Sequence, residues 1–267
     1  MAIIKGPLRF SGSLGGIRGY YDRDLKKWIY ANKGGACKPL IKNNPAFIST
    51  RKLNQEWKGC NIWSKLIRKG TDELDVLKQG RNNCNLLKIA KQIQQMDTEK
   101  EIGWRGIHSS KFNFPLIGFS MSNAHPFREV FYQRYALSIS DDRREVTLVL
   151  NDFIAINKFS WPEKIDSYRV FLTIFELPDV EWMEISRSYS PIYPKDTLGK
   201  QTTYCDWTRA SRNKIDFQLT ASFKEDYVPR EKTTVMVAMG LEFATAMQHG
   251  IPYLVKDNGT MAIIGCF

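Results

Sequence analysis

The spacing of hydrophobic residues predicts a β-hairpin near the N-terminus of this chain. Residues 17–21 and 27–31 read as two strands that flank a polar turn at residues 22–26. Glycines lie before and within the first strand, where they allow tight bends or close approach of backbones. These structural glycines are Gly12, Gly15, Gly16 and Gly19. We interpret residues 38–44 as a basic linker that follows the hairpin.

From Pro45 the hydrophobic positions recur mostly at three- and four-residue steps, which predicts an amphipathic helix ending near Gly70. A second helix begins at Thr71, where acidic residues suit the positive end of a helix. Gly80 weakens its middle, so two shorter helices are the alternative. We expect an antiparallel helix pair from Pro45 to about Met96. The expected buried positions are Phe47, Leu53, Trp57, Cys60, Trp63 and Ile67 in the first helix and Leu74, Leu77, Cys84, Leu87 and Ile93 in the second.

After an irregular stretch at 97–118 and a short helix at 124–132, the pattern becomes that of β-strands. Two polar turns mark hairpins, one at Asp141–Arg144 and one at Asp257–Thr260, where Asn258-Gly259 is the strongest short hairpin signal. Six or more strands separated by turns predict an antiparallel β-sandwich. The expected strands are 135–140, 145–150, 168–176, 214–222, 233–243, 253–255 and 261–265.

The predicted fold class is therefore α+β, with an N-terminal β-hairpin arm and a helix pair before a C-terminal antiparallel β-sandwich. We expect a basic, glycine- and aromatic-rich hairpin arm at 1–44. A helical segment with an irregular connector follows at 45–118, and the β-sandwich domain occupies 119–267. A chain of 267 residues with 43% hydrophobic residues is long and apolar enough to bury a sizeable core.

The positive charge of the chain is concentrated in its first seventy residues. There, 15 lysines and arginines stand against only Asp22, Asp24 and Glu56, whereas the rest of the chain holds 24 basic and 25 acidic residues. Such asymmetry points to an acidic partner, because a surface that is merely solvated normally mixes both signs. The partner can be a polyanion or the acidic surface of another copy of the chain.

The candidate site residues combine these cations with neighbouring aromatic side chains. Because alternate side chains of a strand share a face, Trp28 and Tyr30 should point together, with Lys27 and Ile29 opposite. A basic, aromatic β-surface can hold nucleic acid by its backbone and bases, or it can be an assembly arm with aromatic anchors. The predicted assembly or polyanion-binding residues are Arg18, Tyr20, Tyr21, Arg23, Lys26, Lys27, Trp28, Tyr30, Lys33, Arg51 and Lys52.

No recognised catalytic or metal-binding motif accompanies this surface. The glycine-rich segment fits no phosphate-binding loop, and no nucleophile motif is present. The acid pairs Asp141-Asp142 and Glu225-Asp226 lie in turn-like stretches. His108, His125 and His249 are far apart, and the five cysteines, Cys37, Cys60, Cys84, Cys205 and Cys266, form no C-x-x-C pair. We expect three unrelated histidines, five reduced and mostly buried thiols, and no catalytic residue, metal, cofactor or small-molecule substrate.

No stretch approaches the roughly 20 apolar residues that span a bilayer, and the N-terminus lacks the apolar core of a secretory signal. These features predict a cytoplasmic location by default. Release as part of an assembled particle is left open.

Three stretches carry a resemblance to other proteins. They are Gly12-Ser-Leu-Gly-Gly with its aromatic hairpin, Asn44-Pro-Ala-Phe followed by Thr50-Arg51, and Met239-Gly-Leu-Glu-Phe through Tyr253-Leu to the final strands. Together they resemble a family of uncharacterised bacterial proteins of similar length. The resemblance spans nearly the whole chain and implies a single architecture, but it implies no activity and no site residues.

Together these observations favour a non-enzymatic structural protein that self-assembles as a shell, tube or filament subunit. Its basic N-terminal arm would connect copies by pairing with, or packing on, a neighbour. The alternative is a nucleic-acid-binding protein that uses the basic residues of 1–70 for phosphate contacts. An enzyme is the third and least favoured interpretation.

Overall fold

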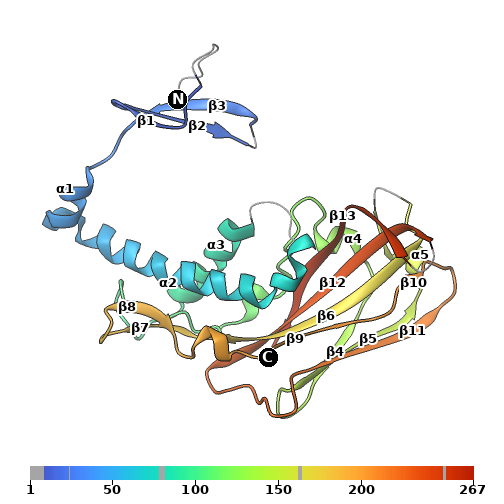
Figure 1. The fold of residues 1–267 in the computed structure, drawn as a ribbon. Coiled ribbons are helices and arrows are strands. Elements are labelled where there is room, and N and C mark those ends of the chain that lie inside the picture. The colour runs from blue at the N-terminus through green and yellow to red at the C-terminus, as the bar shows by residue number, and fades with distance from the viewer. Residues whose placement is uncertain (1–8, 24, 78–81, 162–163, 249–250) are drawn as a thin grey trace. The chain divides into compact units, whose positions relative to one another are not determined.

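Two long strands near the C-terminus organise the larger part of the fold (Figure 1). β12 (Thr233–Gln248) pairs antiparallel with β6 (Ser167–Pro178) on one side and with β13 (Ile251–Cys266) on the other. β9 (Lys200–Tyr204) and β10 (Thr208–Arg209) also pair with β6, which completes a five-stranded sheet. This computed structural model describes residues 9–23, 25–77, 82–161, 164–248 and 251–267.

Two smaller sheets belong to the same part of the chain. β4 (Ala136–Ile139), β5 (Glu145–Phe153) and β11 (Ile215–Ser222) form an antiparallel sheet in the order β11-β5-β4. β7 (Val180–Met183) pairs with β8 (Ser188–Pro191). The predicted hairpin around Asp141–Arg144 and the predicted strand at 214–222 are thus present.

The central strands of the five-stranded sheet are buried on both faces. Val170 and Leu172 of β6 share an apolar cluster with the β4, β5 and β11 sheet. The alternate residues Phe171 and Phe175 share a second cluster with helices. Strands covered on both sides need apolar residues at nearly every position, which explains the continuous apolar run in β6 and β12.

Two helices cover the second of these faces. α2 (Ile48–Gly70) buries Cys60, Trp63 and Ile67 as predicted. α3 (Asn82–Gln95) buries Leu86, Ala90 and Ile93. Leu77 and Ile93 are buried as predicted, whereas the exposed Cys84 corrects the predicted face. The prediction placed Leu77 and Cys84 on one continuous helix, but Leu77 lies in the separate 3-10 segment Asp72–Leu77. Leu53 and Trp57 of α2 are also exposed, and Gly80 lies outside the described residues.

The remaining helical elements are short. They are α1 (Lys38–Asn43), α4 (Phe127–Val130), α5 (Ala155–Lys158) and the 3-10 segments Pro45–Phe47, Phe114–Leu116 and Lys195–Thr197. α1 corrects the prediction of a basic linker at 38–44. A proline occupies its first turn, where the missing N–H costs nothing, and the N–H of Asn44 bonds to the carbonyl of Leu40 at its end.

The predicted turn at Asp257–Thr260 is wrong, because β13 runs through these residues as a strand. Gly259 and Thr260 pair with Glu242 and Leu241 of β12, and a register shift separates these pairs from those between residues 251–254 and the end of β12. Gly259 is also needed where it stands, since a β-carbon there would lie 1.9 Å from the carbonyl oxygen of Leu241. Pairing with β12 therefore overrides the local turn preference of Asn-Gly.

The chain divides into two compact units, Met1–Arg51 and Lys52–Phe267. The first contains an antiparallel sheet in the order β1-β2-β3, formed by β1 (Gly12–Leu14), β2 (Ile17–Asp22) and β3 (Lys27–Asn32). The fold as a whole mixes helices with antiparallel sheets. The finer description as a β-sandwich stays a prediction, because the larger sheet carries helices on its other face.

Candidate functional site

The candidate site is the small sheet of the N-terminal unit. Gly15 and Gly16 join β1 to β2, and Gly15 has a φ of +57°, a left-handed conformation that suits glycine. β2 and β3 pair in continuous register from Ile17 opposite Asn32 to Asp22 opposite Lys27. The predicted hairpin is therefore present, and β1 is an additional strand that the sequence analysis did not predict.

The register divides this sheet into two faces, because side chains alternate along each strand. One face carries Leu14, Ile17 and Asn32 in register at one end and Tyr21 opposite Trp28 at the other. The rings of Tyr21 and Trp28 meet edge to face, with their centroids 5.6 Å apart. Leu14, Ile17 and Tyr21 are 66%, 44% and 46% exposed. We call this surface the apolar face; it comprises Phe10, Leu14, Ile17, Tyr21, Trp28 and Tyr30.

The centre of the apolar face is filled from within the unit. The ring centroid of Phe10 lies 5.2 Å from that of Tyr30, which is buried. A β-carbon on Gly19 would lie 2.6 Å from the carbonyl oxygen of Phe10, so the absence of a side chain lets the Phe10 segment lie against β2. Only the two ends of the face are left exposed, which makes it a surface rather than a closed core.

The opposite face of the sheet carries positive charge. Arg18 and Lys27 point to this side, together with Asp22, which lies opposite Lys27, and the buried Ile29. The guanidinium carbon of Arg18 lies 5.4 Å from the ring centroid of Tyr20. Within the described residues of 9–51, none of the lysines and arginines forms an ion pair. The cations at the strand ends are Arg23, Lys26 and Lys33.

Two predicted site residues have other local partners. Arg51 donates from Nη1 to the carbonyl oxygens of Ile41 at 2.8 Å and Asn44 at 2.9 Å, which satisfies groups at the end of α1. Lys52 belongs to the unit Lys52–Phe267. Its Nζ lies 4.8 Å from the Trp104 ring and 3.6 Å from Glu101. Neither residue adds an uncommitted cation to the sheet.

The sequence analysis missed a buried carboxylate on α2. Glu56 is fully buried, and burial alone would raise its pKa. Arg105 donates to it from Nε and Nη2 at 2.8 and 2.9 Å, the N–H of Gly103 donates at 2.9 Å, and Lys91 forms an ion pair. These donors outweigh burial and lower the pKa of Glu56 to about 2. Its position four residues before Cys60, on the buried stripe of the helix, was the signal that could have found it.

A second polar cluster surrounds His108. Its Nδ1 lies 3.4 Å from Oδ2 of Asp179 and 3.8 Å from Oε1 of Glu181, and its Nε2 lies 3.5 Å from Oδ2 of Asp97. The hydrogen bond with Asp179 outweighs burial and raises the pKa of His108 above its ordinary value of 6.5. The cluster ties the irregular stretch 97–118 to β7, beside a main-chain bridge between Ile107 and Val180.

The His108 cluster predicts a pH dependence of stability. Because the folded-state pKa of His108 is raised, the contribution of its protonated ring to the free energy of unfolding is fully present below pH 6.5. This contribution is lost as the pH rises through the folded-state pKa. We expect His108→Gln to lower the melting temperature most at pH 6, with the difference from the unchanged chain narrowing by pH 9. Thermal unfolding followed by circular dichroism measures this. A difference that stays constant over this range would contradict the assignment.

The other histidines have no role in this cluster. The ring centroid of His125 lies 4.3 Å from that of Trp161, and His249 lies outside the described residues. Among the residues that the structure describes, no group of three or more His, Cys, Asp and Glu side chains is placed to hold a metal ion. All five cysteines are free, but Cys37 and Cys84 are exposed and only Cys60 is buried, which corrects the expectation of mostly buried thiols.

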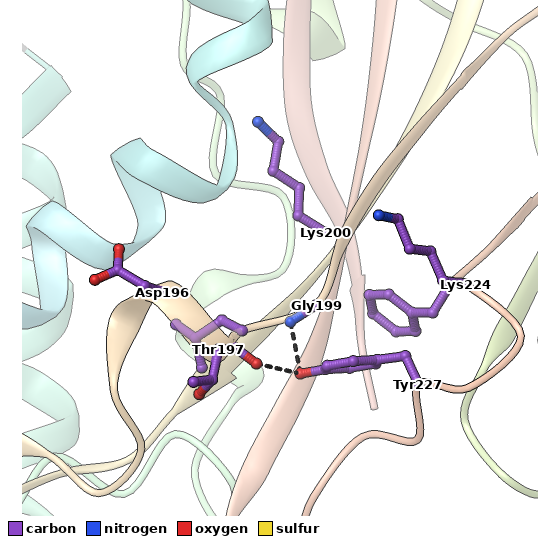
Figure 2. A pocket seen from close by; sticks show the side chains of 8 residues that line it. Asp196, Thr197, Gly199, Lys200, Lys224 and Tyr227 are labelled. Carbon is purple, nitrogen blue, oxygen red and sulfur yellow. Dashed lines mark hydrogen bonds between the residues drawn. The ribbon is translucent and has the colours of Figure 1, made fainter.

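A pocket of about 300 Å³ lies between β9 and the segment that follows β11 (Figure 2). The hydroxyl oxygen of Tyr227 points to the backbone of Thr197 and Gly199 and accepts a hydrogen bond from the N–H of Gly199. Tyr227 also donates to the buried carboxylate of Glu176, which Arg230 contacts at 2.7 Å. Burial raises the pKa of Tyr227 to about 12, so this hydroxyl stays protonated at neutral pH.

The charged groups around this pocket are largely paired. Lys200 forms ion pairs with Asp72 and Glu73, and Lys69 lies 2.7 Å from Asp196. These contacts join the pocket wall to the segment after α2. We assign these contacts no catalytic step.

In the described part of the chain, no helix has the length and apolar character required to cross a membrane. Comparison of the chain with protein-family models, with curated proteins and with solved structures finds no match. The resemblance to a bacterial family therefore stays a prediction, and it supplies no residue roles.

Proposed function

We propose that this chain is a non-enzymatic structural protein that self-assembles into a larger homo-oligomer, with the N-terminal sheet as its connector. The observation that carries the proposal is the apolar face, whose Leu14 and Ile17 are exposed on a sheet of three short strands. Small sheets need a covered hydrophobic face for stability, and exposed apolar patches mark interaction surfaces. Contact with a neighbouring subunit would cover this face.

Removal of the connector is the direct test of this proposal. We expect the nuclease-treated full chain to elute as particles many times larger than its own 30.9 kDa. A variant that lacks residues 1–35 should elute as a folded monomer, because the two apolar clusters of the unit Lys52–Phe267 do not include the deleted residues. Size-exclusion chromatography with light scattering measures both masses, and circular dichroism checks the fold of the variant.

Two outcomes would count against assembly through this sheet. A full chain that is monomeric at high concentration would exclude self-assembly. Particles that persist without residues 1–35 would show that the connector lies elsewhere.

Nucleic-acid binding is the second candidate, and the cations of the N-terminal sheet, which form no ion pair among the described residues of 9–51, favour it. The guanidinium of Arg18 over Tyr20 and the exposed Tyr21 offer positive charge beside aromatic rings. This function predicts an affinity that falls linearly with the logarithm of salt concentration. A filter-binding assay at low salt that retains neither DNA nor RNA would rule it out.

A further inference from the structure

The helix pair carries positive charge on its outer side and exposes no carboxylate of its own. α2 and α3 contain eight lysines and arginines but a single acid, Glu56, which is fully buried. Both helices bury their apolar residues in the cluster beside the large sheet (Figure 1). A surface that is merely solvated normally mixes both signs, so this layer has the charge pattern of a surface that meets a polyanion.

A line of polar residues runs along the solvent side of α2. Its members are all exposed and recur at steps of three and four residues, which places them on one side of the helix. The buried residues Cys60, Trp63 and Ile67 recur in the same way on the opposite side. The line therefore points away from the core. We call it the polar ridge; it comprises Asn54, Lys58, Asn61 and Lys65.

The polar ridge offers the donors that phosphate groups accept. Among the residues that the structure describes, neither Lys58 nor Lys65 forms an ion pair. Seven residues separate these lysines by about 10 Å along the helix axis, so each can neutralise a different phosphate of one duplex.

The two asparagines of the polar ridge add neutral donors. Side-chain amides commonly donate hydrogen bonds to phosphate oxygens, alongside lysine and arginine. Asn61 donates from Nδ2 to the carbonyl oxygen of Trp57 at 2.8 Å. An amide nitrogen carries two hydrogens, so this bond leaves the second for a ligand.

The surroundings of the polar ridge favour a duplex over a lipid surface or a single strand. The exposed apolar side chains Leu53 and Trp57 lie on its flank, where Nζ of Lys91 from α3 lies 5.7 Å from the Trp57 ring. Binding to a lipid interface needs apolar residues that enter the headgroup region, whereas the ridge itself presents amides and ammonium groups. Single strands are held by stacking of bases on aromatic rings, and no aromatic residue belongs to the ridge.

From this arrangement we propose that the polar ridge of α2 binds the phosphate backbone of a nucleic-acid duplex. Lys58 and Lys65 contact phosphates, and Asn54 and Asn61 donate hydrogen bonds beside them. Contacts to phosphate read no base, so this binding is independent of sequence. The site goes beyond the proposed self-assembly and lies in the unit Lys52–Phe267, whereas the second candidate function rests on the N-terminal sheet.

Two double variants test the polar ridge with matched charge. Lys58→Gln/Lys65→Gln removes both cations of the ridge, and Arg212→Gln/Lys224→Gln removes the same charge from the two sides of β11. All four side chains are exposed, so neither variant should unfold, which circular dichroism checks. The probe is a labelled DNA duplex of mixed sequence, about 20 base pairs long. Fluorescence anisotropy follows its binding to the nuclease-treated full chain.

The ridge variant should bind the duplex more weakly than the control variant. We expect Lys58→Gln/Lys65→Gln to raise the dissociation constant about tenfold or more at about 50 mM salt, and the control to change it less than about twofold. Each lost phosphate contact lowers the slope of log affinity against log salt by about one. The slope should therefore fall by about two in the ridge variant only. Equal effects of the two variants would show that net charge alone matters and would overturn the proposal.

Two further measurements locate the contact. If Arg18→Gln/Lys27→Gln abolishes binding while the ridge variant binds like the unchanged chain, the N-terminal sheet is the site and the proposal is overturned. If phosphatidylserine vesicles bind the chain through Lys58 and Lys65 and the duplex does not bind, the ridge is a lipid surface instead.

The outcome for self-assembly is separate from the outcome for this contact. A full chain that stays monomeric but binds the duplex through Lys58 and Lys65 would exclude self-assembly while the contact stands. A chain that forms particles but does not bind the duplex would overturn the contact alone.

Discussion

Glu56→Ala is expected to lower the free energy of unfolding by about 3 to 5 kcal/mol, the size found when one partner of a buried ion pair is removed. The variant leaves Arg105 and Lys91 without their carboxylate, although each side chain is only 14% exposed. It also leaves the N–H of Gly103 without its acceptor. Urea unfolding at pH 7 measures the loss through the midpoint and slope of the transition.

Glu101→Ala is the matched control for this prediction. Glu101 is 80% exposed and lies 3.6 Å from Lys52, and exposed pairs of this kind contribute about 0.5 kcal/mol or less. If Glu56→Ala unfolds no more easily than Glu101→Ala, the buried network does not stabilise the fold.

Acid titration gives an independent check on Glu56. Its folded-state pKa of about 2 lies below its ordinary value of 4.5, so the contribution of the carboxylate is complete above pH 4.5. The contribution is then lost as the pH falls toward 2. The stability difference between the unchanged chain and Glu56→Ala should narrow over this interval.

Gly240→Ala is expected to lower the free energy of unfolding by about 3 kcal/mol, through overpacking of the central sheet. Gly240 lies on β12 opposite Phe171 of β6. A β-carbon at this position would lie 1.4 Å from Cζ of the Phe171 ring, which is fully buried. The ring or the strand must therefore move, and close packing on both faces of the sheet resists either movement. Chemical denaturation measures the loss.

A double-mutant cycle tests the cause of this effect. Phe171→Leu removes the ring, so Gly240→Ala should cost much less in that background than in the unchanged chain. Gly34→Ala is the control, because a β-carbon at Gly34 would meet no atom within 4 Å. This substitution should leave the free energy of unfolding nearly unchanged. An equal cost of Gly240→Ala with and without the Phe171 ring would show that the clash is not the cause.

Much of the fold could be predicted where the local pattern and the tertiary environment agree. The hairpin of β2 and β3 followed from aromatic residues on both sides of a polar turn. β6 followed from partial alternation and a wealth of Val, Phe, Thr and Ile, and Trp63 and Ile67 followed from helical spacing. At these positions, burial needs the same residues that local preference favours.

The errors arise where distant contacts decide the structure. Gly259 is in a strand because it pairs with Glu242 of β12, and no local signal shows this pairing. Glu56 entered the sequence analysis only as one of three acids in the first seventy residues, because its partner Arg105 lies nearly 50 residues later. Arg51 looked like an available cation, but its guanidinium satisfies carbonyls at the end of α1. In each case, the structure at the residue could be predicted only if its contact partner in the folded chain was already known.

The position of β13 along the chain has a consequence for biosynthesis. Ala262 and Ile264 of this strand complete the cluster beside the β4, β5 and β11 sheet, and Met261 and Ile263 complete the cluster beside the helices. Both apolar clusters are therefore incomplete until β13 has been synthesised. The growing chain therefore presents the apolar face of β6, and later that of β12, until β13 has been synthesised, and exposed apolar surface at this stage favours aggregation.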